Sequence, residues 1–411
     1  MQGEHTRTDE TRILGLLGGL LILAFFANRL SRVSRVPDLL ILMLTGLILG
    51  PLSGFLRAGE LAGFTRYLGT FALILILFEA GTEIRLREAL RHFPAGLLFA
   101  FLSYGASFAA TASVGRWLLD LTPHQSLLFG AVLGCVSGTI VIPVLQQFEI
   151  AGPVSVVLVL EAALGDVIAV ITVGSLTDIA EGDPLLSGLV KGLVTRTAVA
   201  TIAAVAAGLL WSRVRSRFAA DRFGSVQQVG VVLVVFALTR LAGGSGLLAV
   251  LALGLTLANA RGGADSALDA RGPLMFHSDL SFLIRSFFFV LLGASFELIG
   301  RAYLLAAAAV LGGLVLARIA SVYALRLAMP AIRKPERQLL MTLFPRGLVN
   351  AVLAIQVAGR ASAMHFLPAM AFTVILVTNL LVVLATSRIG PTAVAPTTPV
   401  EVAPRKSRLG G

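Results

Sequence analysis

Residues 153–176 read PVSVVLVLEAALGDVIAVITVGSL, and only Glu161 and Asp166 interrupt this apolar run. A charged side chain at the centre of a bilayer costs about 2.5–3.5 kcal/mol even on lenient insertion scales, so both acids need a physical reason to be there. Residues five apart on an α-helix differ by about 140° in direction and about 7.5 Å in height. The two carboxylates therefore point in different directions, which predicts that one faces an aqueous cavity and the other faces a neighbouring helix.

The composition of the chain is that of a polytopic membrane protein. Its 411 residues are 57% hydrophobic and 13% charged, and the mean hydropathy is +0.90. An ordinary soluble domain has about 25% charged residues. The single cysteine, Cys135, excludes an internal disulfide and a CxxC metal site, and its expected state is a small packed apolar residue.

Apolar runs long enough to cross about 30 Å of hydrocarbon recur along the whole chain. We therefore predict an all-α membrane domain at 13–388 with about thirteen transmembrane helices. The predicted spans are 13–28, 37–56, 67–82, 94–115, 124–148, 153–176, 189–210, 226–241, 246–260, 280–296, 302–327, 337–358 and 366–386. Residues 1–12 and 389–411 would be tails, and the Pro- and Thr-rich composition of the second tail predicts disorder.

The distribution of basic residues predicts the orientation of these spans. When alternate connections are taken as cytoplasmic, one side carries about twice as many Lys and Arg residues as the other, which places the N-terminus outside and the C-terminus in the cytoplasm. The loop with Asp178, Glu181 and Asp183 lies on the outer side and is acidic. The net charge of +11 is scattered over short loops, so we expect no nucleic-acid partner. The compact size favours a prokaryotic plasma membrane.

Charged side chains also fall inside or at the edges of other spans. The acids Glu79, Glu161 and Asp166 and the arginines Arg285, Arg318 and Arg346 form a nearly balanced set. Buried charges are tolerated when they are paired, so structural ion pairs are one explanation of this set. Small and uncharged polar residues such as Gly, Ser and Thr associate membrane helices at lower cost, which favours a functional role for some of the charges.

Two spans carry Gly and Pro where a membrane helix would otherwise be unbroken. They contain GCVSGTIVIPVLQQF at 134–148 and TLFPRGLVNAVLAIQV at 342–357. These are spans 5 and 12, which are equivalent if spans 1–6 and 8–13 form two inverted repeats. Interrupted segments at matching places of two repeats point to the midplane binding site of a transporter, because helix ends and freed carbonyl groups can bind ions there.

Four motifs resemble the sodium/proton exchanger branch of the monovalent cation–proton antiporters. They are LFEAGTEI at 77–84, EAALGD at 161–166, LARIASVY at 316–323 and FPRGLVNAVLAIQ at 344–356. The resemblance implies a homodimer in which spans 1–3 and 7–10 form a dimerisation part and spans 4–6 and 11–13 form a transport part with crossed, broken helices. It also implies exchange of Na⁺, or of K⁺ or Li⁺, for H⁺ by an elevator-like movement. We expect no cofactor and no enzymatic activity.

The same resemblance assigns roles to individual residues. Asp166 matches the aspartate that binds either the cation or the proton. Glu79 matches a glutamate that lines the ion path and helps to hold the cation. Thr139 matches the threonine of the unwound part of span 5. Ser137, in the same unwound part, is a further candidate ion ligand, with a helix-bending hydroxyl as the alternative.

The remaining assignments concern support of the site. Glu161 matches an acid that pairs with a basic residue of span 11, here Arg318, and Arg346 matches an arginine of the broken part of span 12. Asn350 either lines this broken part or satisfies freed backbone groups. Gly165 lies one turn after Glu161, and its small size is expected to leave room for the Arg318 guanidinium.

Three positions depart from the family pattern. The family usually has Ser, Asn and Asp where this chain has Ala162, Gly165 and Ile140. The side chains that are missing are ion ligands or supports for ligands, so the resemblance leaves the preferred cation and its coordination open.

A single carboxylate explains antiport in physical terms. Removal of a carboxyl group from water favours its neutral form, whereas a carboxylate is a hard oxygen ligand that suits a small cation. A site that holds either a proton or a cation makes the two compete, and alternating exposure of this site turns competition into exchange. If Asp166 alone takes up protons, the exchange is electroneutral, with one cation for one proton. K⁺/H⁺ exchange is an alternative, and a sodium-coupled symporter is a weaker one because the chain offers few uncharged polar groups for an organic ligand.

Overall fold

A computed structural model describes residues 15, 18–31, 36–54, 58–83, 86–147, 150, 152–179, 185–215, 224–259, 271–296, 300–330 and 332–386. Within these ranges the regular secondary structure is entirely helical. The two predicted tails, 1–12 and 389–411, lie outside the described residues.

Every predicted span contains an observed helix, so the prediction of an all-helical membrane fold is confirmed. The first helix is Gly18–Ser31. The helices that follow are α2 (Asp38–Leu47) with a π-helical turn (Ile48–Leu52), α3 (Ala58–Glu83), α4 (Leu86–Leu118), α5 (Pro123–Leu133), α6 (Gly138–Gln147), α7 (Pro153–Thr177), α8 (Leu185–Arg215), α9 (Gly224–Leu241), α10 (Gly246–Asn259), α12 (Arg271–Ala294), α13 (Arg301–Ala328), α14 (Lys334–Thr342), α15 (Leu348–Ala358) and α16 (Leu367–Thr386).

Helix length and composition support insertion into a membrane. Among the described residues, six helical segments are long and apolar enough to cross a bilayer: Phe93–Leu118, Pro123–Leu145, Pro153–Thr177, Val190–Val214, Tyr303–Ala328 and Leu367–Thr386. Other apolar helices are shorter, at 10–17 residues. The chain is therefore an integral membrane protein built from both full-length and interrupted helices.

Close helix packing depends on glycine where α2 crosses α12. A Cβ atom at Gly46 would overlap the backbone oxygen of Val290, and a Cβ atom at Gly293 would overlap that of Met43. Lipid tails are as apolar as leucine, so packing rather than the hydrophobic effect holds membrane helices together, and small residues let their backbones approach. The two glycines therefore let the backbones of α2 and α12 come into contact.

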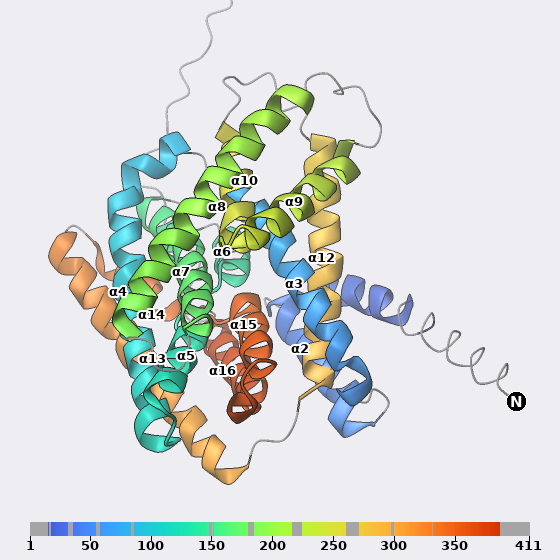
Figure 1. Cartoon of the computed structure of the whole chain (residues 1–411). Helices are drawn as coiled ribbons and strands as arrows, with labels where there is room; N and C mark the ends of the chain where they lie inside the picture. Colours follow the sequence, from blue (N-terminus) through green and yellow to red (C-terminus); the bar gives the residue numbers. More distant parts are fainter. Residues whose placement is uncertain are drawn as a thin grey trace, which may run out of the picture.

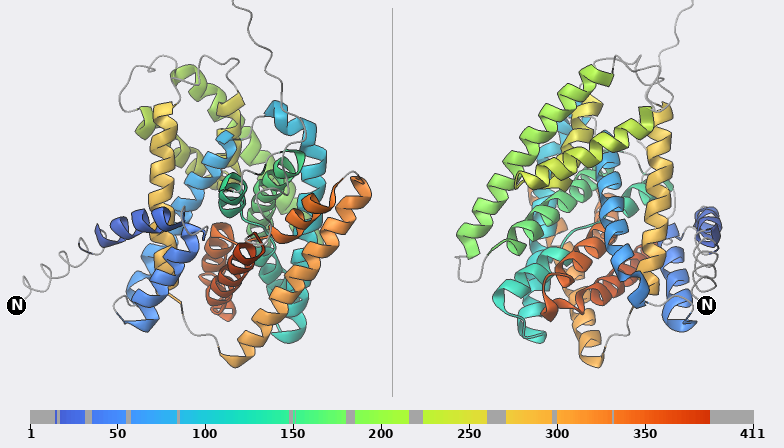
Figure 2. Two further views of the ribbon diagram at one scale, coloured as in Figure 1. Left: turned by 180° about the vertical axis from the view of Figure 1, so that it is seen from behind. Right: turned by 45° about the vertical axis from the view of Figure 1, so that its right-hand side comes forward.

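The helices gather into two groups with α15 and α16 between them (Figure 1). In one group α4 packs against α5, α7 and α13, and in the other α3 packs against α10 and α12. Figure 2 shows the same separation from behind, with α15 and α16 again in the middle. Helix α15 contacts α3 on one side and α5 and α7 on the other, so it bridges the two groups, which also touch directly where α7 meets α10.

Candidate ion-binding site

Spans 5 and 12 are each broken into two half-helices, as predicted from their Gly and Pro content. Residues 134–137 separate α5 from α6, and residues 343–347 separate α14 from α15. The two unwound segments touch, because the backbone N–H of Ser137 donates a hydrogen bond of 2.9 Å to the carbonyl oxygen of Pro345. Proline has no N–H and disfavours the helical conformation at the residue before it, which explains the break at Phe344 and Pro345.

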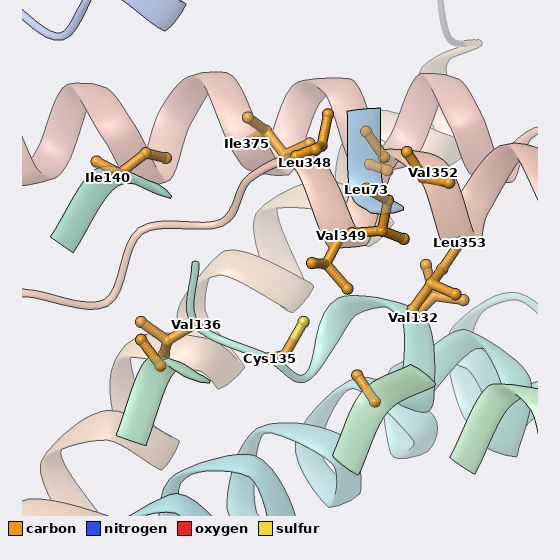
Figure 3. Close-up of a cluster of buried hydrophobic side chains, with 14 of the residues drawn as sticks. Leu73, Val132, Cys135, Val136, Ile140, Leu348, Val349, Val352, Leu353 and Ile375 are labelled. Atoms are coloured by element: carbon orange, nitrogen blue, oxygen red, sulfur yellow. The ribbon is translucent and has the colours of Figure 1, made fainter. Parts of the chain in front are cut away.

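The crossing is too close for a side chain at Gly347. A Cβ atom at this position would overlap the hydroxyl group of Ser137. Apolar side chains seal the crossing from both spans (Figure 3). They are Val132, Cys135, Val136 and Ile140 from span 5 and Leu348, Val349, Val352 and Leu353 from span 12, with Leu73 and Ile375 beside them.

A helix that ends inside a membrane leaves carbonyl groups without partners. Arg346 donates from Nε to the oxygen of Leu133, 2.9 Å away, at the end of α5. The Nδ2 atom of Asn350 donates to Val132 and Cys135 in the same turn, at 2.8 and 3.3 Å. Of the two roles considered for Asn350, the structure shows the satisfaction of freed backbone groups.

Arg318 does the same for the other broken helix. Its Nε and Nη2 atoms donate to the carbonyl oxygens of Leu340 and Leu343 at the end of α14, at 2.6 and 2.5 Å. A positive charge is stabilised at the C-terminal end of a helix, where the macrodipole is negative. Each broken span therefore has a buried arginine at the end of its first half-helix, Arg346 for α5 and Arg318 for α14.

Glu161 forms an ion pair with Arg318. Both side chains are 2% exposed, and Nη1 of Arg318 also donates a hydrogen bond of 3.1 Å to the hydroxyl oxygen of Ser103. The guanidinium lies over the ring of Phe99, 4.7 Å from its centre. The structure thus places Glu161 against a neighbouring helix, in the pair with Arg318 that the resemblance implies.

Asp166 lies on a different side of α7, against the unwound part of span 5. It is 5% exposed, and its Oδ1 atom has no hydrogen-bond partner among the described residues. The thiol of Cys135 and the backbone N–H of Gly138 lie near the carboxylate. Gly138 is the first residue of α6, so the positive end of this half-helix faces the acid.

No ion pair of the described residues neutralises Asp166. Arg346 is close enough to act on it electrostatically, but its hydrogen bonds go to the oxygen atoms of Leu133, Phe344 and Ser107. The charge balance in the sequence suggests that Arg346 pairs with an acid, and the structure gives it neutral oxygen partners instead. Asp166 is therefore a buried carboxylate that remains open to a proton or a cation.

The neighbouring hydroxyl groups and Glu79 occupy different places. The hydroxyls of Ser137 and Thr139 are 2.8 Å apart beside the start of α6. Glu79 is partly buried on α3, and no hydrogen bond or ion pair of the described residues joins it to Asp166. The structure thus brings Ser137 and Thr139 to the crossing and leaves Glu79 on a separate helix.

The prediction that Gly165 makes room for the Arg318 guanidinium is wrong. A Cβ atom at Gly165 would contact Cys135 and the backbone nitrogen of Val136, at 3.9 and 4.0 Å. The residue therefore faces the unwound part of span 5. A methyl group at this position would make only ordinary van der Waals contacts there, so the approach of α7 to span 5 does not depend on glycine.

Several polar residues that hold the crossing were not predicted from the sequence. Asn379 donates to the carbonyl oxygen of Arg346 at 2.8 Å, and Thr378 accepts from the Arg346 backbone N–H at 3.2 Å. Ser103 and Ser107 accept from the two arginines. A signal was available, because the two serines are one helical turn apart in an apolar span, and polar side chains in such spans commonly bind across helices.

The described residues contain no group of three or more His, Cys, Asp or Glu side chains that gathers as a resident metal site would. The oxygen atoms at the crossing include the carboxylate of Asp166, the hydroxyl groups of Ser137 and Thr139, and backbone carbonyl groups. Such a set suits a hard monovalent cation that binds and leaves, in competition with a proton.

Comparison with known proteins agrees with this chemistry. The family model described as sodium/hydrogen exchanger, transmembrane, matches residues 20–396. The chain is 26% identical over 361 residues to Na⁺/H⁺ antiporter 1 of Methanocaldococcus jannaschii, which covers 84% of this chain and 83% of that protein. It is also 26% identical over 258 residues to the K⁺/H⁺ antiporter NhaP2 of Shewanella oneidensis, where it spans less than half of the relative, 45%.

The fold has a close counterpart among solved structures. The sodium proton antiporter MjNhaP1 from Methanocaldococcus jannaschii at pH 8 superposes with a TM-score of 0.74 at 23% sequence identity. The match covers 91% of this chain and 95% of that one. At this identity the structural match carries the fold alone.

Proposed function

The chain belongs to the sodium/hydrogen exchanger family, and we propose that Asp166 is the carboxylate at which its cation and its proton compete. The protein is a secondary active transporter that exchanges a monovalent cation for H⁺, and not an enzyme. The observation that carries the proposal is the position of Asp166. It is buried at the crossing of two broken helices, without an ion-pair partner among the described residues, while the other acid of α7 is paired with Arg318.

Na⁺ is the proposed cation, with K⁺ as the alternative. The Na⁺/H⁺ relative covers most of both chains, whereas the K⁺/H⁺ relative is matched over less than half of its length. In the proposed site the cation binds the Asp166 carboxylate with hydroxyl oxygens of Ser137 and Thr139, while Glu79 contributes from the ion path. One titrating carboxylate gives one cation per proton.

Further parts of the proposal concern assembly and movement. Spans 4–6 and 11–13 would move as a transport domain, against a domain of spans 1–3 and 7–10 that forms a homodimer in lipid. Glu161 and Arg318 would move together within the transport domain, because one lies in span 6 and the other in span 11. The basic loops favour an outer N-terminus and a cytoplasmic C-terminus, in a prokaryotic inner membrane.

The proposal is tested in proteoliposomes with a trapped pH-sensitive dye. Addition of Na⁺, K⁺ or Li⁺ should move protons in the wild type and fail to do so in Asp166→Asn, which keeps the shape of the side chain. Asp120→Asn is the matched control, because Asp120 is exposed in the turn before α5 and asparagine tolerates its positive φ of 50°. Equal proton movement in wild type and Asp166→Asn would contradict the role of Asp166, and no response to any of the three cations would contradict the exchange itself.

A further inference from the structure

A second cluster of charges lies away from the crossing, where several helices end. Asp178 follows the last residue of α7, Arg240 is in the last turn of α9, and Arg360 follows α15. Asp178 forms an ion pair with Arg196 of α8 and lies 3.9 Å from Arg360. The ends of membrane helices lie at the depth of the lipid headgroups, so this cluster is placed where phosphate groups are found.

The cluster carries an excess of positive charge. Three arginines, Arg196, Arg240 and Arg360, lie around the single acid Asp178 in the lining of one cavity. The charge of Arg196 is repelled by the like charges of Arg240 and Arg360. They line a cavity of about 170 Å³, together with Ser245 and Gly246 at the start of α10. The positive end of α10 adds to the field, because a helix N-terminus attracts anions. A cavity of this charge repels cations and suits an anion.

An apolar cavity adjoins the charged one. It has a volume of about 400 Å³ and is lined by Phe71 and Ile74 of α3 and by Leu233 and Phe236 of α9. The two cavities share Arg240 and Arg360 at their boundary. The guanidinium of Arg240 lies over the ring of Phe236, 5.8 Å from its centre, so one side chain touches both the charged and the apolar part.

The surface around the apolar cavity is also apolar. On α9, Val234, Leu238 and Leu241 are 55%, 60% and 84% exposed, and such side chains face the hydrocarbon of a bilayer. Tyr67 of α3 lines the cavity and is 78% exposed, as expected for an aromatic residue at the level of the headgroups. A ligand that occupies both cavities therefore needs an anionic head and an apolar chain, and it reaches them from the membrane. Helices α8, α9 and α10 pack against one another (Figure 1).

We propose that these adjoining cavities bind one anionic phospholipid, with its phosphate among Arg196, Arg240 and Arg360 and an acyl chain between α3 and α9. Arginine binds phosphate through paired N–H groups, and it is more weakly hydrated than lysine. Asp178 competes with the phosphate for the same guanidinium groups. The site is independent of Asp166, and it stands whether or not Asp166 carries the cation.

Native mass spectrometry of the full-length protein in detergent tests this site. Dioleoyl phosphatidylglycerol should bind at least about tenfold more tightly than dioleoyl phosphatidylcholine, a difference of about 1.4 kcal/mol. Both lipids carry a phosphate, but the choline cation of the second is repelled by the arginine cluster. The double variant Arg240→Gln/Arg360→Gln should lose this preference. Lys191→Gln should retain it, because Lys191 is an exposed cation on α8, the helix of Arg196, but does not line either cavity.

Asp178→Asn separates a lipid site from a merely structural charge cluster. It removes the competing acid, so phosphatidylglycerol should bind more tightly than in wild type. A structural cluster would instead lose stability without any gain in lipid binding, which would overturn the proposal.

The wild type alone decides between sources of phosphate, even if the double variant fails to fold. Inorganic phosphate and glycerol 3-phosphate, at the concentration of the lipid, should protect the protein against thermal unfolding far less than phosphatidylglycerol. Equal protection would show a site for a free anion and overturn the assignment to lipid. Equal binding of phosphatidylglycerol and phosphatidylcholine would show that the arginines do not select a headgroup, with the same consequence.

Discussion

We predict that the buried ion pair of Glu161 and Arg318 stabilises the fold and takes no part in ion transport. Arg318→Met removes the guanidinium, leaves Glu161 charged and buried, and frees the carbonyl groups of Leu340 and Leu343. Removal of one partner from a buried pair typically costs about 3–5 kcal/mol. Glu161→Gln removes the negative charge but keeps an oxygen that accepts a hydrogen bond from Arg318. In this variant Arg318 keeps its hydrogen bonds to Ser103 and to the carbonyl oxygens of Leu340 and Leu343. Glu161→Gln should therefore lower the free energy of unfolding by about 1–3 kcal/mol, the cost of leaving one buried polar group only partly satisfied.

The assay combines thermal unfolding in detergent with exchange in proteoliposomes. Stability should fall from wild type to Glu161→Gln to Arg318→Met. The double variant Glu161→Gln/Arg318→Met should lose about 0.5–3 kcal/mol less stability than the two single variants lose together, because no unpaired carboxylate is left in it. Folded Glu161→Gln should still exchange cations for protons. Strictly additive costs, or complete loss of exchange in folded Glu161→Gln, would refute the structural role of the pair.

Three further predictions concern the helix crossing and the stoichiometry of ion exchange. Gly347→Ala should destabilise the protein by about 1–3 kcal/mol in thermal unfolding, because the new methyl group overlaps the hydroxyl of Ser137, whereas Gly105→Ala, with open space around it, should have little effect. Equal stability of the two variants would contradict the close approach. Asn350→Leu should cost about 2–5 kcal/mol by the same measurement, because it leaves buried backbone groups such as the Val132 carbonyl without a donor; an unchanged midpoint would show that these groups find other partners. Exchange should be electroneutral, so a membrane-potential dye should report no charge movement beyond leak, and a sustained current would contradict a single titrating carboxylate.

The main features of the fold were predictable from the sequence for physical reasons. Apolar runs set the spans, because a bilayer imposes a minimum length, and Gly and Pro marked the two breaks. The different directions of Glu161 and Asp166 followed from helix geometry alone. A charged residue in a bilayer is costly enough to be informative even without any knowledge of its neighbours.

The partners of the buried arginines were not predictable in the same way. Arg346 reaches Leu133 and Ser107, which are more than two hundred residues away in the chain. The sequence suggested a partner of opposite charge, but a free helix end offers a cluster of carbonyl oxygens that serves as well. The arginine cluster around Asp178 was missed for a related reason, because its members come from α8, from the last turn of α9 and from the segments that follow α7 and α15, which are far apart in the chain.

The dependence of the half-saturating Na⁺ concentration on pH tests competition at Asp166 most directly. Initial rates of exchange in proteoliposomes are measured over a range of Na⁺ concentrations at several pH values. If a cation and a proton share one carboxylate, the half-saturating concentration should rise by about tenfold for each pH unit lost in the acidic range, while the maximal rate stays constant. A half-saturating concentration that does not change with pH, with only the maximal rate affected, would contradict a shared site.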